Sequence, residues 1–193
     1  GAEDDFTVVD GYAGKTNEYA PSVAIEQIVN ELNPAKIEIR DKALKVADGF
    51  MRKDNAIKIQ YASKYASIAN YWKKWIGETQ GLKKSNAVAV KKESEKEFQQ
   101  KIVKAGKEKE YGTLLADFDK NYTEIAPYAV ARDYFTEIVL RNTELLSTGY
   151  KLYQLEEVYK SKGEQSFNDQ KNNLIAGLAD FYKNFNATVD EKV

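Results

Sequence analysis

The stretch from residue 55 to 76 constrains the fold most strongly, because its apolar side chains recur at spacings of three and four residues. They are Ile57, Tyr61, Tyr65, Ile68, Trp72 and Trp75. At about 100° per residue these side chains share one face of an α-helix. The opposite face carries Ser63, Ser67, Asn70 and Lys74. We therefore predict a long helix with one buried face and one hydrated face.

The sequence from Pro21 onward is typical of one helix after another. It contains only two further prolines, Pro34 and Pro127, and proline is common in the first turn of a helix, so we expect a helix to begin near each of them. Asn33 and Asp54 are predicted N-caps, because their short polar side chains can accept a hydrogen bond from the first turn.

Glycines and caps suggest where the helices end. Gly77 and Gly81 are expected to weaken or end the long helix, and a turn is predicted over residues 106–112. We expect an interruption at Gly149, and a last helix that starts near Ser166 with Asp169 in a capping-box position.

These patterns predict an all-α fold, a multi-helix antiparallel bundle-like domain. Residues 1–16 differ, since the β-prone run from Phe6 to Val9 precedes Gly11 and Gly14. We expect an N-terminal arm or strand remnant over residues 1–16 and a single helical domain over residues 17–193.

The composition excludes several classes of chemistry. The chain contains no cysteine and no histidine, so it lacks thiol nucleophiles, Cys/His zinc sites and the usual base of a serine triad. The 29 basic residues are balanced by 30 acidic ones, so no net field attracts nucleic acid or an anionic membrane. We expect no catalytic residue, no cofactor and no metal site in this chain, and neither nucleic acid nor a membrane as a partner.

Two surface patterns have a plain structural interpretation. The lysines between residues 83 and 109 alternate with glutamates, which favours a solvated helix face over a phosphate-binding one. The aromatic residues between Tyr61 and Trp75 lie mostly on the predicted buried stripe, which favours core packing over ligand stacking. The residues alone therefore indicate a helical, non-catalytic domain.

Three runs of sequence carry a resemblance. They are Leu32-Asn-Pro-Ala-Lys-Ile-Glu-Ile-Arg-Asp-Lys42, Ile59-Gln-Tyr-Ala-Ser-Lys-Tyr-Ala-Ser-Ile-Ala-Asn-Tyr-Trp-Lys73 and Gly81-Leu-Lys-Lys-Ser-Asn86. With Gly14-Lys-Thr-Asn-Glu-Tyr19, they closely resemble the dipeptidyl-peptidase 7 and dipeptidyl-peptidase 11 family of serine peptidases. The resemblance covers about the first half of the chain.

The resemblance implies a parent enzyme that removes dipeptides from free N-termini. In this family a chymotrypsin-like double β-barrel holds the catalytic triad, and an inserted helical domain covers the active-site cleft. The chain resembles most of that insert, whose helical region continues further in the family. Family membership also implies a periplasmic or cell-surface location. The implied partners are the catalytic domain and a peptide substrate with a free N-terminus.

One site residue follows from the resemblance. In the family, an asparagine of the cap helps to hold the terminal ammonium of the substrate, and Asn70 of the Ala-Asn-Tyr-Trp-Lys run matches it. Its side-chain oxygen can accept hydrogen bonds from an ammonium group. One departure from the family pattern lies near the start, where Asp10 and Ala13 differ from it, and a second is that the helical region of the family continues beyond this chain. The alternative is a free-standing helical protein-interaction module.

Overall fold

The computed structural model describes residues 19–193, and all regular secondary structure in this range is helical. The expectation of an all-α fold is therefore confirmed. The arm or strand predicted over residues 1–16 lies outside the described residues.

The described chain contains α-helices and two π-helical segments. In chain order they are α1 (Ser22–Gln27), the π-helix η1 (Ile28–Leu32), α2 (Asn33–Met51), α3 (Asn55–Lys84), α4 (Ala87–Lys104), α5 (Glu108–Tyr111), α6 (Leu114–Phe135), the π-helix η2 (Thr136–Asn142), α7 (Glu144–Asn184) and α8 (Ala187–Asp190).

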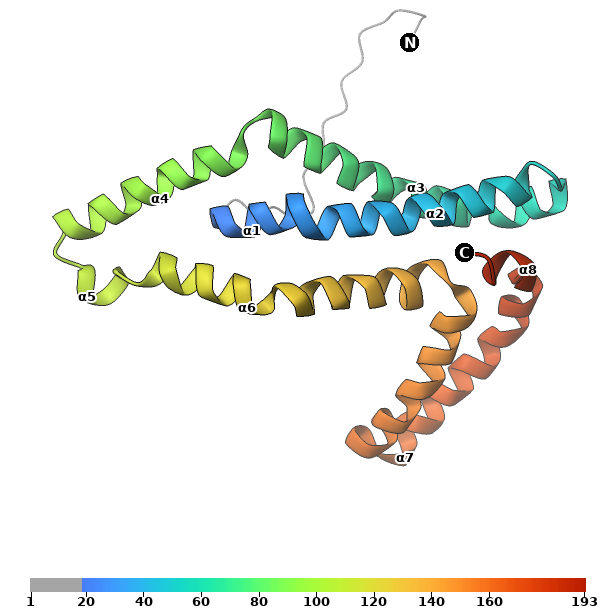
Figure 1. The fold of residues 1–193 in the computed structure, drawn as a ribbon. Helices are drawn as coiled ribbons and strands as arrows, with labels where there is room; N and C mark the ends of the chain where they lie inside the picture. The colour runs from blue at the N-terminus through green and yellow to red at the C-terminus, as the bar shows by residue number, and fades with distance from the viewer. Residues whose placement is uncertain (1–18) are drawn as a thin grey trace, which may run out of the picture.

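The helices form three long rods and a projecting hairpin (Figure 1). The central rod consists of α1, η1 and α2, with α3 and α4 returning along one side and α6 and η2 along the other. Consecutive rods run antiparallel, as predicted. The long helix α7 folds away from the rods, and α8 brings the C-terminus back to α2.

The caps agree only in part with the sequence predictions. Asp54 caps α3 as expected, since its Oδ1 accepts hydrogen bonds from the backbone N–H of Ala56 at 2.7 Å and of Ile57 at 3.4 Å. The cap predicted at Asn33 is wrong. The backbone is helical through η1 into α2, and Asn33 is buried with its amide directed at α3. Side-chain contacts between helices override the local capping preference there.

Pro127 does not begin a helix. It lies inside α6, so this prediction is wrong. A proline there leaves the carbonyl of residue 123 without its helical donor. Pro127 and Thr123 are both exposed, so water can satisfy that carbonyl. The buried positions Ala129 and Asp133 beyond it keep the helix packed against the central rod.

The glycines act differently from one another. Gly77 and Gly81 do not end α3, and Gly149 does not interrupt α7. Gly163, in contrast, has a φ of 81° and divides α7 into two arms, residues 144–162 and 164–184. The helix start predicted near Ser166 therefore lies two residues after the beginning of the second arm. The arms meet where the rings of Tyr159 and Phe167 lie 5.6 Å apart.

The predicted stripe of α3 is confirmed: Tyr61 and Trp75 are buried and the other four members are half-buried. At the distal end Tyr61 joins Ala47 of α2 and Val189 of α8 in the core, with Phe50 and Ile57 packed against them. This cluster fixes the C-terminus to the first long helices.

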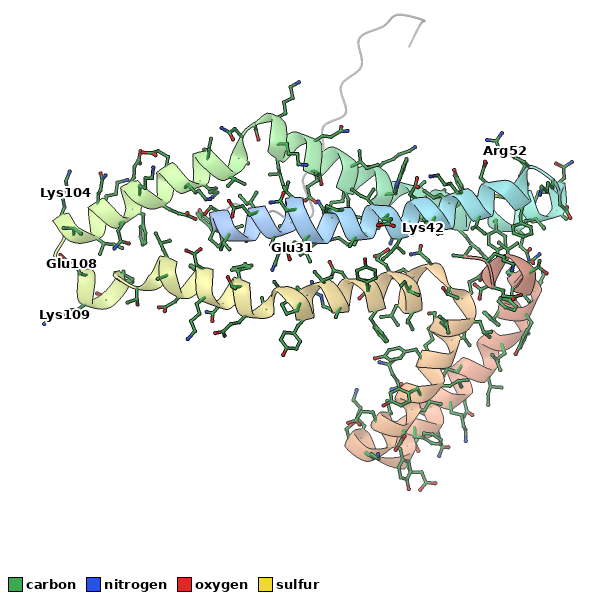
Figure 2. The ribbon with its side chains drawn as sticks, viewed as in Figure 1. Glu31, Lys42, Arg52, Lys104, Glu108 and Lys109 are labelled. Atoms are coloured by element: carbon green, nitrogen blue, oxygen red, sulfur yellow. The ribbon has the colours of Figure 1, made fainter. Side chains whose placement is uncertain are left out.

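The charged residues of α4 and α5 form a solvated surface, as predicted. Ion pairs such as Lys96 with Glu93 and Lys107 with Glu110 join exposed side chains. Lys104 and Lys109 project from the outer end of the molecule (Figure 2). Exposed pairs of this kind contribute little to stability, because water and salt screen their charges.

Candidate functional site

The exposed face of α3 carries the predicted site residue. Asn70 is exposed, and so are Ser63 and Ser67 on the same face. Among residues 19–193 the side chain of Asn70 has no hydrogen-bond partner, so both its donors and its acceptor are available to a ligand.

A cavity of about 540 Å³ lies beside α3, between its buried stripe, from which Tyr61, Ile68 and Trp75 line it, and its hydrated face. Its walls come from α2, α3, η2, the start of α7 and α8, and they include Ser63, Ser67, Tyr71, Arg141, Glu144 and Asp190. Asn70 is not among the lining residues. At about 100° per residue its side chain points about 20° from Ser63 and about 60° from Ser67 but about 100° from Tyr71, so it lies outside the cavity, on the hydrated face of α3.

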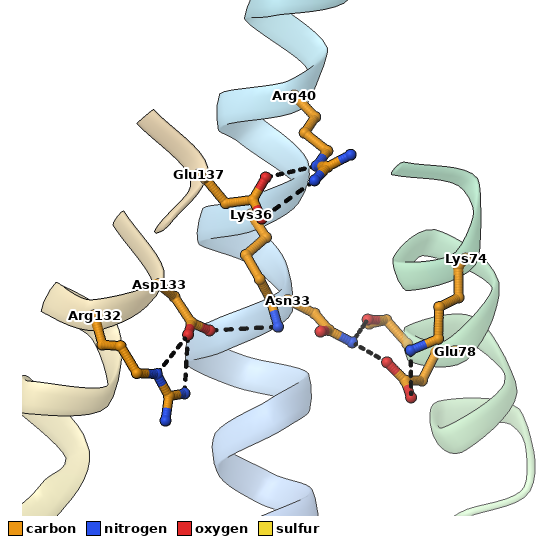
Figure 3. A network of polar contacts seen from close by, with 9 residues as sticks. Asn33, Lys36, Arg40, Lys74, Glu78, Arg132, Asp133 and Glu137 are labelled. Atoms are coloured by element: carbon orange, nitrogen blue, oxygen red, sulfur yellow. Dashed lines mark hydrogen bonds and ion pairs between the residues drawn. The ribbon is translucent and has the colours of Figure 1, made fainter. Parts of the chain in front are cut away.

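A buried ion pair lies beneath the same turn of α3 (Figure 3). Arg40 of α2 donates to Glu137 of η2 through Nε to Oε2 at 2.6 Å and through Nη2 to Oε1 at 3.3 Å. Its Nη1 donates to the backbone oxygens of Ser67 at 3.5 Å and Ile68 at 3.1 Å. One guanidinium thus joins three helical elements.

A second set of polar contacts continues along α2 (Figure 3). Lys36 Nζ lies 3.4 Å from Oδ2 of the buried Asp133 and 4.7 Å from the ring centre of Trp75. The Asn33 amide donates to Glu78 Oε2 at 3.0 Å and to Thr79 Oγ1 at 3.1 Å. These contacts hold α3 and α6 on opposite sides of α2.

The base of the α7 hairpin is fastened by a third set. Asp190 of α8 accepts hydrogen bonds from the backbone N–H of Glu144 at 2.6 Å and of Leu145 at 3.0 Å, so it caps α7 from another helix. Lys64 Nζ donates to Glu144 Oε1 at 2.6 Å and to the backbone oxygen of Asn184 at 2.5 Å. Both ends of the hairpin are therefore tied to α3.

Tyr61 lies within this third set. Its hydroxyl donates to Glu144 Oε1 at 3.3 Å. Burial raises the pKa of the Tyr61 hydroxyl, and the negative charges of Glu144 and Asp190 raise it further. The phenol therefore keeps its proton through the physiological range.

The sequence predicts Asn70 as a site residue but does not indicate the residues beneath it. Arg40, Glu137 and Asn142 are all buried, and the Asn142 amide donates to the backbone oxygen of Glu137 at 2.6 Å. One local signal was available, since Arg40 lies on the same face of α2 as the apolar residues Ile37, Ala43 and Leu44. A charge in that position indicates a buried partner.

The side chains on the hydrated face of α3 are polar or charged. The chain has no histidine or cysteine to activate a nucleophile. No group of three or more acidic side chains in residues 19–193 is placed to hold a metal ion, and none of the described helices is both long and apolar enough to cross a membrane. What the site offers is an amide, two hydroxyls and a mixed-charge cavity wall, which suit a polar ligand.

Comparisons with known proteins give a consistent result. The family model described as Peptidase S46 matches residues 1–193. The chain is 74% identical over 191 residues to an "Asp/Glu-specific dipeptidyl-peptidase" of Flavobacterium psychrophilum, covering 99% of this chain and 27% of that protein. A protein of the same description from Capnocytophaga gingivalis is 54% identical over 191 residues, with 99% and 27% covered.

A more distant relative carries a different description. The "Dipeptidyl-peptidase 7" of Porphyromonas gingivalis is 32% identical over 191 residues, covering 98% of this chain and 25% of that protein. The chain thus spans about a quarter of the length of the curated relatives it matches.

Proposed function

Because this chain belongs to the Peptidase S46 family, we propose that it is the helical cap of a serine dipeptidyl aminopeptidase that releases N-terminal dipeptides from peptides. The cap covers the active-site cleft and binds the free N-terminus of the substrate through Asn70. It performs no catalysis alone, since the triad belongs to the barrel. The enzyme acts in the periplasm or at the cell surface.

The state of Asn70 carries the proposal. An exposed amide without a partner lies on the hydrated face of α3, within the run that resembles the amine-binding segment of the family. An ammonium group buried under a cap without acceptors would lose several kcal/mol of hydration free energy. An amide oxygen on this face compensates part of that loss, so the cap selects a free amine over a blocked one.

The surface of α7 supports a second part of the proposal, that the cap packs on the rest of the peptidase. In the first arm Leu145, Leu152 and Tyr159 recur every seven residues and are each more than half exposed, at 54%, 52% and 53%. Beside them Leu146 and Tyr153 are 47% and 70% exposed. An apolar stripe of this kind marks an interaction surface. About three quarters of the length of the relatives lies outside the matched part, and this additional chain is long enough to cover the apolar stripe.

The names of the relatives suggest the substrate. Two of them, at 74% and 54% identity, are described as Asp/Glu-specific. We propose the same preference for acidic residues here, and we assign its recognition to the catalytic domain. The alternative, a free-standing interaction module, would also explain the apolar stripe of α7, but the relatives in which this segment is part of a longer peptidase favour the cap.

The test is kinetic and uses the full-length peptidase. Asn70→Ala is expected to lower kcat/KM on a chromogenic dipeptide with a free amine by tenfold or more, about 1.4 kcal/mol of binding. An N-acetylated form of the same substrate should show no such difference between the two enzymes, since it has no ammonium to bind.

A matched control separates binding from general damage. Asn30 is exposed on η1, outside the run that resembles the amine-binding segment, so Asn30→Ala should leave kcat/KM within about twofold. If Asn70→Ala is as active as the native enzyme while both melt at the same temperature, Asn70 does not anchor the amine and the cap role has to be abandoned.

A further inference from the structure

The ion pair between Arg40 and Glu137 is unusual in this chain because both of its side chains are buried, whereas pairs such as Arg52 with Asp48 join exposed side chains. The side chains of Arg40 and Glu137 are only 6% and 5% exposed. Removing two charges from water costs several kcal/mol per ion, and a buried pair is therefore weak evidence for added stability. Its geometry suggests a different use.

The remaining donors of Arg40 are directed at the backbone of α3. They reach the carbonyl oxygens of Ser67 and Ile68, which lie three and two residues before Asn70. The guanidinium carbon also lies 5.3 Å from the ring centre of Tyr71 and 4.8 Å from that of Trp75. Two carbonyls and two rings together fix both the rotation of α3 and its position along the helix axis at this turn.

The carboxylate of Glu137, which accepts hydrogen bonds from Arg40, is also held in place. Asn142 donates to the backbone oxygen of Glu137 at 2.6 Å and to its Oε2 at 3.3 Å. Glu137 and Asn142 are five residues apart in the π-helix η2, where that spacing brings them into register. Asn142 thereby holds the carboxylate in the orientation that a bidentate contact with Arg40 requires.

We infer that Arg40 is a positioning residue, which with Glu137 fixes the turn of α3 that carries Asn70 so that the amide meets the substrate ammonium in one orientation. The inference rests on the proposed function. Lysine cannot replace arginine in this role, because a single ammonium cannot span a carboxylate on η2 and two carbonyls on α3 at once.

The first experiment compares Arg40→Lys with Arg52→Lys in the full-length peptidase. Arg52 is the matched control, since it pairs with Asp48 at the exposed end of α2. Arg40→Lys is expected to raise KM about tenfold for a free-amine dipeptide substrate with kcat little changed, because amine binding is lost equally in the ground state and the transition state. Arg52→Lys should change neither constant more than about twofold.

The second measurement reports directly on the backbone of α3 around Asn70. Backbone hydrogen exchange over residues 63–76 should be faster in Arg40→Lys than in Arg52→Lys, while exchange in α4 stays the same in both. If Arg40→Lys fails to fold, Glu137→Gln keeps the shape of the side chain and is expected to change KM and exchange in the same direction by a smaller factor.

A double variant decides whether the effect passes through Asn70. In an Asn70→Ala background, Arg40→Lys should lower kcat/KM by less than about threefold, since the amide to be positioned is absent. Two results would overturn the role of Arg40 while leaving the proposed function intact. One is unchanged hydrogen exchange over residues 63–76 in Arg40→Lys. The other is an Asn70→Ala enzyme of lowered kcat/KM in which Arg40→Lys lowers kcat/KM by as much again as it does in the native enzyme. An Asn70→Ala enzyme of native activity would instead refute the proposed function, and the positioning role with it.

Discussion

At the scale of single residues, polar groups in this chain gain their properties from neighbours that are distant in the sequence. Arg40 and Glu137 are 97 positions apart, and the N–H groups of Glu144 and Leu145 are capped by Asp190, 46 and 45 positions away. Buried charged and polar groups are tolerated only with such partners. The same holds for Tyr61, whose hydroxyl meets Glu144 from 83 positions away.

A prediction about pH follows for Tyr61. Its pKa is raised in the folded chain, above the value of about 10 for an unfolded tyrosine. Above pH 10 the unfolded chain loses this proton while the folded chain keeps it, so the stabilisation is complete below pH 10 and is lost as the pH rises. At pH 8, Tyr61→Phe should cost about 1 kcal/mol for the lost hydrogen bond.

Urea unfolding at pH 8 and at pH 11 tests the prediction. The difference in free energy of unfolding between the native chain and Tyr61→Phe should shrink, or change sign, at the higher pH. A difference that is the same at both pH values would show that the phenol is not perturbed by its surroundings.

At the scale of elements, the two arms of α7 depend on a single backbone position. Gly163 has a φ of 81°, in the left-handed region that a side chain disfavours. Gly177 lies within the second arm, where the backbone is helical and an added Cβ would meet no atom within 4 Å. Two glycines in one helix therefore have opposite requirements.

Substitution by alanine should separate them. Gly163→Ala is expected to lower the free energy of unfolding by about 1 kcal/mol or more, because the turn between the arms needs a positive φ. Gly177→Ala is expected to raise it by about 0.5–1 kcal/mol, because alanine restricts the unfolded chain and favours helix. Chemical denaturation measures both, and a stabilising Gly163→Ala would mean that α7 is one continuous helix.

At the scale of the whole molecule, the C-terminal segment closes the structure. Val189 is completely buried in the cluster with Ala47 and Tyr61, while Asp190 beside it caps α7. The cluster and the cap together join α8 to α2, α3 and the hairpin. Losing either should loosen the cavity wall that α8 helps to form.

Val189→Ala tests this closure. We expect a loss of about 2 kcal/mol in the free energy of unfolding, from two buried methyl groups and the space they leave. Val90→Ala is the control, since Val90 is 60% exposed on α4 and should cost less than about 0.5 kcal/mol. Equal losses in the two variants would show that the α8 contact does not hold the molecule together.

The sequence by itself determined the features that depend on neighbouring residues. The three- and four-residue spacing of the apolar stripe predicted both the buried face of α3 and the exposure of Asn70, and Asp54 marked the start of that helix. The absence of histidine and cysteine excluded catalysis of the triad type, and the motifs pointed to the right family. Periodicity, short-range capping and composition are local properties, so they can be read without a fold.

The tertiary structure decided which of several equivalent residues takes a special role. Gly77, Gly149 and Gly163 are alike in sequence, but only Gly163 turns the chain, and Asn33 became an interhelical donor instead of a cap. The contacts of Arg40 with Glu137 and with the backbone of α3 could not be predicted from the sequence, because only the packing of η2 and α3 against α2 brings these groups together. Long-range contacts depend on the packing of whole helices, and no local pattern specifies them.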